Sequence, residues 1–330
     1  MTFLIPPAPA SEPMTIQLAG EKFLVNAESA VKLKESALYK YRLLFKQMGD
    51  FARNRGLRYL KELDLTMLDE FRAVWKDGPR SSAKKLERLR SFFRFALERE
   101  WVTKNPTGGL KAPSVKQRPT MPYTREEMLR ILASVDKYRE QFPTRGKENA
   151  LRLRALVLLL RYSGMRIGDA VSLAVDRISG ERLFLYTQKT GVAVNIVLPR
   201  FVLKALEATP EVTDEHFFWN GIDKLETIVG SWRKRLSKLF ELAEVEKGHA
   251  HRFRDTFAVE LLLAGVPIER VSVLLGHQSV RITEKYYAPW VRSRQDQLEA
   301  DLRRAWEHDP ISLMETKGTP EVHGKNETIN

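Results

Sequence analysis

Apolar residues recur at helical spacing along most of the chain. The stretch 36–56 places Leu38, Tyr41, Leu44 and Phe45 on one face, with Gly56 as a stop signal. Two more helices are predicted, in LTMLDEFRAVWKDG up to Asp77-Gly78 and in SSAKKLERLRSFFRFALEREW. The last of these directs one set of side chains inward and leaves a basic set outside: Leu86, Leu89, Phe92, Phe93 and Leu97, against Lys84, Lys85, Arg88 and Arg99.

The pattern changes after Asn105, where four prolines and two adjacent glycines indicate an interdomain linker. A capping box at Thr124–Glu127 then begins a new helical region. The stretch ERLFLYTQKTGVAVNIVLP alternates on both sides of Lys189-Thr190-Gly191 and predicts a β-hairpin. Helices are expected around it at about 148–162, 200–208, 223–243, 252–264, 267–275, 282–289 and 292–307.

The predicted fold is therefore mainly α with a small antiparallel β-sheet (α+β). Its expected organisation is a lead-in, a basic helical domain, a linker, a second domain and a polar tail, at 1–30, 31–107, 108–123, 124–307 and 308–330.

The charge distribution indicates what kind of partner the protein binds. The net charge is +13, and residues 31–118 alone hold 22 Lys and Arg against 10 Asp and Glu. Such a segment is either a set of solvated helix faces or a surface that binds phosphates, and the excess favours a polyanionic partner. The chain has no cysteine, no apolar run of membrane-spanning length and no pattern of a signal peptide. We therefore expect a cytoplasmic protein without a membrane partner.

Two segments carry arginines suited to an anion. Arg166 follows a long apolar helix, where a guanidinium needs an anionic partner, either a ligand or Asp169. His251 and Arg254 are spaced i, i+3 at the start of a helix, which favours an oxyanion or phosphate. The alternative is that the two residues form a surface pair without a ligand.

Histidines and tyrosines supply the remaining candidates. His249 and His251 raise the question of a metal, but no carboxylate at ligand spacing joins them, so neither a metal nor a cofactor is predicted. His277 ends VSVLLGH, where a capping or core role competes with a functional one. Tyr286 and Tyr287 follow in RITEKYYAPW, where tyrosines are usually packing residues. Each segment alone is ambiguous.

Their order and spacing are informative. GMRIGD, a hairpin lysine, HRFR, LLGH and a tyrosine about ten residues later resemble the tyrosine recombinases of the phage integrase family, over 155–290. The segment 31–107 looks like the N-terminal core-binding domain of that family. The resemblance implies a catalytic domain at 124–307 in which five residues surround the scissile phosphate: Arg166, Lys189, His251, Arg254 and His277.

The resemblance also implies a tyrosine nucleophile. Tyr286 and Tyr287 stand nine and ten positions after the LLGH histidine, and both positions occur in the family. Members that resemble this chain across TEK-x-YAPW have a histidine in place of Tyr286, so Tyr287 is the predicted nucleophile and Tyr286 the alternative. In the family, Glu is frequent at the position of Asp169, and His is common at the position of Asp255. Both are interpreted as supporting residues that orient the arginines.

The reaction implied is cleavage and rejoining of DNA through a 3′-phosphotyrosyl link, which needs no ATP and no metal. Two permanently charged guanidiniums would hold the nonbridging oxygens. His251 would accept the phenol proton, His277 would hydrogen-bond the phosphate, and Lys189 would protonate the departing 5′-oxygen.

The expected partner is double-stranded DNA with specific recombination sites. Family members act as homo-tetramers in which the C-terminal helix docks on a neighbour. The stripe Leu298, Leu302 and Trp306 suits such docking, or packing against its own domain. Two other functions stay open at this stage: a type IB topoisomerase-like enzyme that relaxes DNA, and a catalytically silent DNA-binding protein.

Overall fold

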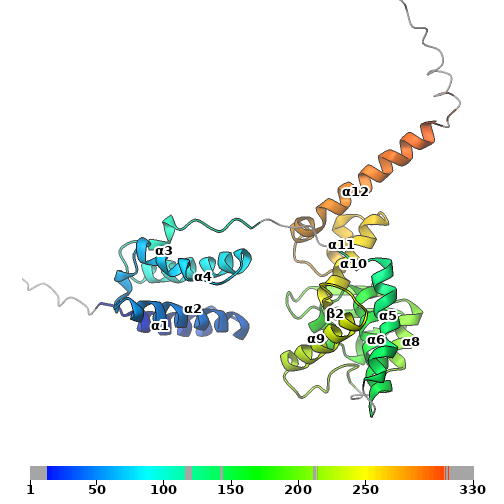
Figure 1. Cartoon of the computed structure of the whole chain (residues 1–330), viewed down its shortest axis with the longest axis horizontal. Coiled ribbons are helices and arrows are strands. Elements are labelled where there is room, and N and C mark those ends of the chain that lie inside the picture. The colour runs from blue at the N-terminus through cyan, green and yellow to red at the C-terminus, as the bar shows by residue number, and fades with distance from the viewer. Residues whose placement is uncertain are drawn as a thin grey trace, which may run out of the picture. The chain divides into compact units, whose positions relative to one another are not determined.

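A computed structural model describes residues 13–115, 121–141, 144–210, 213, 215–307, 309 and 311 of the chain. The chain divides into two compact units, residues 1–117 and 118–330, and each has its own hydrophobic core (Figure 1). Most of the predicted polar tail lies outside the described residues, as do the linker residues 116–120 and the first twelve residues of the lead-in. Within the described part, no helix combines the length and apolar character needed to cross a membrane.

The first unit is helical. Its elements are α1 (Ile16–Ser29), α2 (Glu35–Asn54), α3 (Leu65–Ala73) and α4 (Pro79–Glu98), with short 3-10 helices at Leu60–Glu62 and Pro106–Gly109. The lead-in predicted at 1–30, with at most one short element, contains a 14-residue helix, α1, which packs on α2 with the ring centres of Phe23 and Tyr41 4.8 Å apart. Small residues on the buried face of α1, such as Ala19 and Ala27, weaken its apolar pattern in the sequence.

Two side chains of α4 differ from their predicted placement. Lys85 is only 8% exposed, forms an ion pair with Asp77 and lies 4.8 Å from the ring centre of Trp75. It is therefore not on the outer surface, because position 85 falls next to the core-facing stripe that includes Leu86. Leu97, expected inside, is 38% exposed near the end of the helix.

The second unit is also mainly helical and contains one small sheet. Its helices are α5 (Arg125–Glu140), α6 (Gly146–Ser163), α7 (Ile167–Val171), α8 (Arg200–Glu207), α9 (Leu225–Leu242), α10 (Ala250–Leu263), α11 (Ile268–Leu274) and α12 (Val280–Glu307), with a 3-10 helix at Val175–Arg177. The mainly α fold with a small antiparallel sheet is thus confirmed. The capping box is confirmed as well, since Thr124 and Glu127 exchange hydrogen bonds at the start of α5.

The sheet consists of β1 (Ile178–Ser179), β2 (Arg182–Tyr186) and β3 (Ala193–Val197), antiparallel and in that order. The predicted hairpin is β2 and β3, paired from Arg182 with Val197 to Tyr186 with Ala193. The alternation in the sequence buries Leu183, Leu185, Val194 and Ile196 against the core. The hairpin turn, which carries Lys189, therefore starts from a fixed base.

Helix α12 replaces two predicted helices. The chain continues as one helix from Val280 to Glu307 with Pro289 inside it. A proline removes one backbone donor from a helix, and here the flanking turns remain helical. In Figure 1 the C-terminal part of α12 extends away from the rest of its unit.

Candidate active site

Arg166 is positioned by a turn that only glycine tolerates well. Gly164 ends α6 with φ of +62°, and a Cβ there would lie 2.4 Å from the ring of Phe257. Arg166 then begins α7 from an extended conformation. Its Nη1 atom is buried and finds no hydrogen-bond partner among the described residues. A buried guanidinium nitrogen in this condition is well suited to an anionic ligand.

Arg254 is held rigidly inside the same region. It lies on α10, is 3% exposed, and donates hydrogen bonds to the carbonyl oxygens of Gly164 at 2.8 Å and Leu275 at 2.6 Å. These bonds tie the turn before Arg166 to the end of α11. Burial, together with the nearby Arg166 cation, lowers the pKa of Arg254 to about 10, so it stays positively charged at neutral pH.

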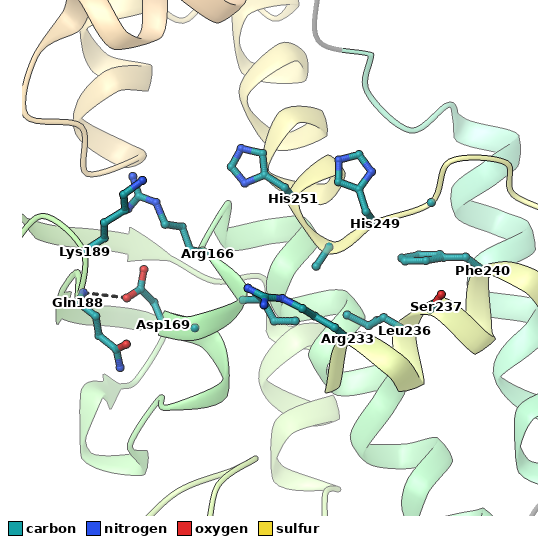
Figure 2. Close-up of a pocket in the computed structure, with 14 residues that line it drawn as sticks. Arg166, Asp169, Gln188, Lys189, Arg233, Leu236, Ser237, Phe240, His249 and His251 are labelled. Atoms are coloured by element: carbon teal, nitrogen blue, oxygen red, sulfur yellow. Dashed lines mark hydrogen bonds between the residues drawn. The ribbon is translucent and has the colours of Figure 1, made fainter. Parts of the chain in front are cut away.

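Asp169 does not form the expected ion pair with Arg166. Its Oδ1 accepts a hydrogen bond from the backbone N–H of Gln188 at 2.9 Å, which links α7 to the hairpin turn (Figure 2). The turn has a second attachment, because Thr190 Oγ1 donates to the carbonyl of Gly276 at 3.1 Å. Lys189 lies between these two anchored residues and is exposed.

The two predicted histidines differ in their surroundings. His277 Nδ1 forms a 2.8 Å hydrogen bond with Thr283 Oγ1, which leaves Nε2 as the ring atom able to meet a ligand. Burial, and then the charges of Arg254 and Arg166, lower the pKa of His277 to about 4. Burial also lowers the pKa of His251, although the Asp255 carboxylate acts in the opposite direction. Both imidazoles are therefore neutral at neutral pH.

Of the predicted residues, Arg166, Lys189 and His251 line a pocket of about 550 Å³, and Arg254, His277 and Tyr287 are not among its lining residues. Figure 2 shows Arg166 and Lys189 on one side of it, His249 and His251 on another, and Arg233 reaching in from α9. Sequence analysis missed Arg233. The available signal was the basic run 233–235 directly after a core-facing tryptophan, which places one arginine at the border of the buried helix face.

The two candidate tyrosines differ in burial and in hydrogen bonding. Tyr287 is 2% exposed and its hydroxyl donates a 2.7 Å hydrogen bond to Asp255 Oδ1, whereas Tyr286 is 40% exposed. Burial and the Asp255 carboxylate raise the pKa of Tyr287. Asp255 was expected to orient an arginine, but it contacts the predicted nucleophile instead. The guanidinium of Arg254 is hydrogen-bonded to the carbonyl oxygens of Gly164 and Leu275.

The basic residues predicted to bind DNA lie on α4 and at its end. Lys84 and Arg99 are exposed, Arg88 is partly exposed, and Lys85 is buried in its ion pair. Arg99 lies over the ring of Phe95, 3.7 Å from its centre. Three of the four predicted residues are thus accessible on the first unit.

Comparisons with known proteins agree with these observations. The sequence profile of the phage integrase family matches residues 123–291. The tyrosine recombinase XerD of Staphylococcus epidermidis is 24% identical over 281 residues, which cover 81% of this chain and 92% of that protein. The tyrosine recombinase XerD of Rhizobium meliloti is 29% identical over 222 residues, covering 62% and 69%.

Solved structures show the same fold. A lambda integrase dimer bound to a COC′ core site is similar with a TM-score of 0.65 and 19% identity, covering 83% of this chain and 77% of that one. The recombinase XerH in a post-cleavage complex with palindromic difH is similar with a TM-score of 0.62 and 19% identity, covering 87% and 84%. Both likenesses extend over more than the region matched by the family profile.

Proposed function

The chain belongs to the phage integrase family, and we propose that it is a site-specific DNA recombinase that cleaves and rejoins strands through a 3′-phosphotyrosyl intermediate. One observation carries the proposal. The second unit gathers Arg166, Lys189, His277 and Arg254 around one region, and the residue after Arg254 holds the hydroxyl of Tyr287.

The arginines would stabilise the charge that develops on the nonbridging phosphate oxygens. Nη1 of Arg166 is buried and has no hydrogen-bond partner in the part of the chain that the structure describes, and Arg254 is a fixed cation beside it. Because both are in place before DNA arrives, little reorganisation is needed in the transition state. His277 would add a hydrogen bond to the phosphate from Nε2.

The nucleophile and leaving group need opposite proton transfers. Tyr287 would attack phosphorus and lose its proton, while Lys189, exposed on the anchored hairpin turn, would supply a proton to the departing 5′-oxygen. Since Tyr287 is 2% exposed, we propose that DNA binding shifts the start of α12 and brings the hydroxyl to the phosphate. The link retains the phosphodiester energy, so a second strand's 5′-hydroxyl can rejoin it.

Double-stranded DNA is the partner that the charge of the first unit favours. Residues 31–118 carry the basic excess, and Lys84, Arg88 and Arg99 are accessible there. The similar lambda integrase is bound to DNA in its crystal structure. We propose that these three side chains contact backbone phosphates, which would make binding weaken steeply as salt rises.

The first test uses a nicked duplex that traps the intermediate. The recombination site can be taken from DNA flanking the coding sequence or selected by binding. In EDTA, we expect a protein–DNA adduct that survives denaturation, and release of the adduct when a strand with a free 5′-hydroxyl is added. Cleavage that leaves no adduct and stops in EDTA would contradict the proposal and indicate a hydrolytic metal nuclease.

We further propose that α12 mediates assembly into a homo-tetramer on DNA. The stripe expected to pack against its own domain or a neighbour is exposed: Leu298 is 41%, Leu302 51% and Trp306 56% exposed. An exposed apolar stripe on an extending helix is suited to docking against a second protomer. A lambda integrase tetramer on a Holliday junction is among the similar structures.

Replacing all three stripe residues with serine is expected to convert four-protomer complexes on paired sites into smaller ones, while binding to a single site persists. Light scattering of the protein–DNA complex measures the change. Ile222→Ser is a matched control, because Ile222 is 88% exposed outside α12. An unchanged tetramer in the triple variant would exclude this role of the stripe.

A further inference from the structure

The hydroxyl of the predicted nucleophile donates a hydrogen bond to a carboxylate. Asp255 Oδ1 lies 2.7 Å from the hydroxyl oxygen of Tyr287, and Asp255 is 6% exposed. His251, the acceptor expected from the sequence, has its Nε2 3.7 Å from that same carboxylate oxygen. Among the described residues, the hydroxyl of Tyr287 is hydrogen-bonded to the carboxylate and not to this imidazole. A base must be within hydrogen-bond reach of the proton it removes. Asp255 meets that condition in the structure, and its role as base requires the contact to persist when the start of α12 shifts.

We propose that Asp255 is the general base of the cleavage step and takes the proton of Tyr287 as its oxygen attacks phosphorus. The assignment rests on the proposed function, in which Tyr287 is the nucleophile. It extends that function by giving a direct chemical role to a residue that the sequence marked only as supporting the arginines.

The step balances without a further reactant. The O–H bond of Tyr287 breaks and its proton moves to Asp255 Oδ1, while the phenol oxygen bonds to phosphorus. The bond between phosphorus and the 5′-oxygen breaks, and Lys189 gives that oxygen a proton. In rejoining, Lys189 takes the proton of the attacking 5′-hydroxyl, and Asp255 returns its proton to Tyr287.

The surroundings of Asp255 favour proton transfer during the attack itself. Arg254 and His251 face it from α10, His249 from the start of that helix, and Tyr287 from α12. Burial raises the pKa of Asp255, although the neighbouring Arg254 cation acts in the opposite direction. The raised pKa makes this carboxylate a stronger base than an exposed one. Burial and the Asp255 carboxylate raise the pKa of Tyr287. A phenolate is therefore disfavoured before the attack on phosphorus begins.

The decisive variant is Asp255→Asn in the full chain. The amide keeps the size of the carboxylate and an oxygen that accepts the phenol hydrogen bond, but it cannot take up the proton. We expect DNA binding to persist and single-turnover adduct formation to fall about 10²–10³-fold at neutral pH. Asp176→Asn, whose side chain is 74% exposed away from the site, serves as the control.

The pH profile distinguishes a base from a packing residue. The wild-type rate should rise with pH and level off once Asp255 and the neighbouring His251 have lost their protons. The variant rate should continue to rise into alkaline pH, because its phenolate must form by loss of the proton to water. A fluorinated tyrosine at position 287, with a more acidic hydroxyl, should restore the variant about tenfold and change the wild type little.

The outcomes are distinct. A variant that cleaves as fast as the wild type, or faster, would overturn the proposal and show that the contact merely holds the tyrosine. So would a slow variant with a wild-type pH profile and no response to the fluorinated tyrosine, since that pattern indicates lost packing. If the wild type itself forms no adduct, the proposed function fails, and Asp255 loses its assignment with it.

Discussion

Tyr287→Phe is expected to abolish the covalent adduct with DNA, and Tyr286→Phe to leave it nearly unchanged. Removing the nucleophile should lower adduct formation by about 10⁴-fold or more, since the remaining groups cannot form the link. Only Tyr287 has its hydroxyl bonded to Asp255, beside Arg254. Tyr286 is 40% exposed, and neighbouring residues on a helix point about 100° apart. Denaturing gels of the nicked duplex, run after single-turnover incubation, measure both variants.

Each variant is the control for the other, because each removes only the hydroxyl from one of two adjacent rings. Binding to the intact duplex should persist in both, which separates loss of chemistry from loss of recognition. Tyr287→Phe also leaves a buried Asp255 without its hydrogen bond, so we expect a modest loss of stability, about 1–3 kcal/mol. An adduct that persists in Tyr287→Phe and disappears in Tyr286→Phe would reassign the nucleophile.

Local patterns determined most of the fold. The hairpin followed from alternation around Lys189, and the start of α5 from the Thr124 capping box. Helix α1 was missed because its buried face includes small residues, and the contacts that stabilise it come from α2. The two helices predicted near Pro289 are one, since a single missing backbone donor did not end the helix.

The sequence marked several of the residues that the structure brings together, but not Arg233 and not the contacts between them. The sequence marked Arg254 and Asp255, yet their partners lie on segments far away in the chain: Gly164, Leu275 and Tyr287. Such pairings depend on how α10, α11 and α12 pack, which spacing within one helix cannot reveal. The same limit explains Lys85, whose helix face could be predicted only to within a residue.

Arg166→Ala and Arg254→Ala are expected to lower the cleavage rate by similar factors. Arg254→Ala is also expected to lower the free energy of unfolding substantially, and Arg166→Ala only slightly. Each variant removes a cation from the phosphate site, and the loss of one such preorganised donor typically lowers the rate about 10²–10³-fold. Arg254 also bonds the carbonyl oxygens of Gly164 and Leu275, which would remain buried without partners, at a cost of about 1–3 kcal/mol each. Nη1 of Arg166 is buried without a hydrogen-bond partner among the described residues, so removal of this side chain should cost little stability.

Thermal unfolding and single-turnover adduct formation, measured on both arginine variants, test this difference. A loss of 3 kcal/mol corresponds to a fall in Tm of roughly 6–12 °C for a unit of about 200 residues. Arg200→Ala is the control for lost positive charge, because that side chain is 86% exposed and pairs with Glu181 outside the site. If Arg166→Ala cleaved like the control, the partnerless nitrogen would have no part in binding the phosphate. If Arg254→Ala unfolded at the wild-type temperature, its two carbonyl bonds would not hold the turn before Arg166, and the rigid placement of both cations would have to come from elsewhere.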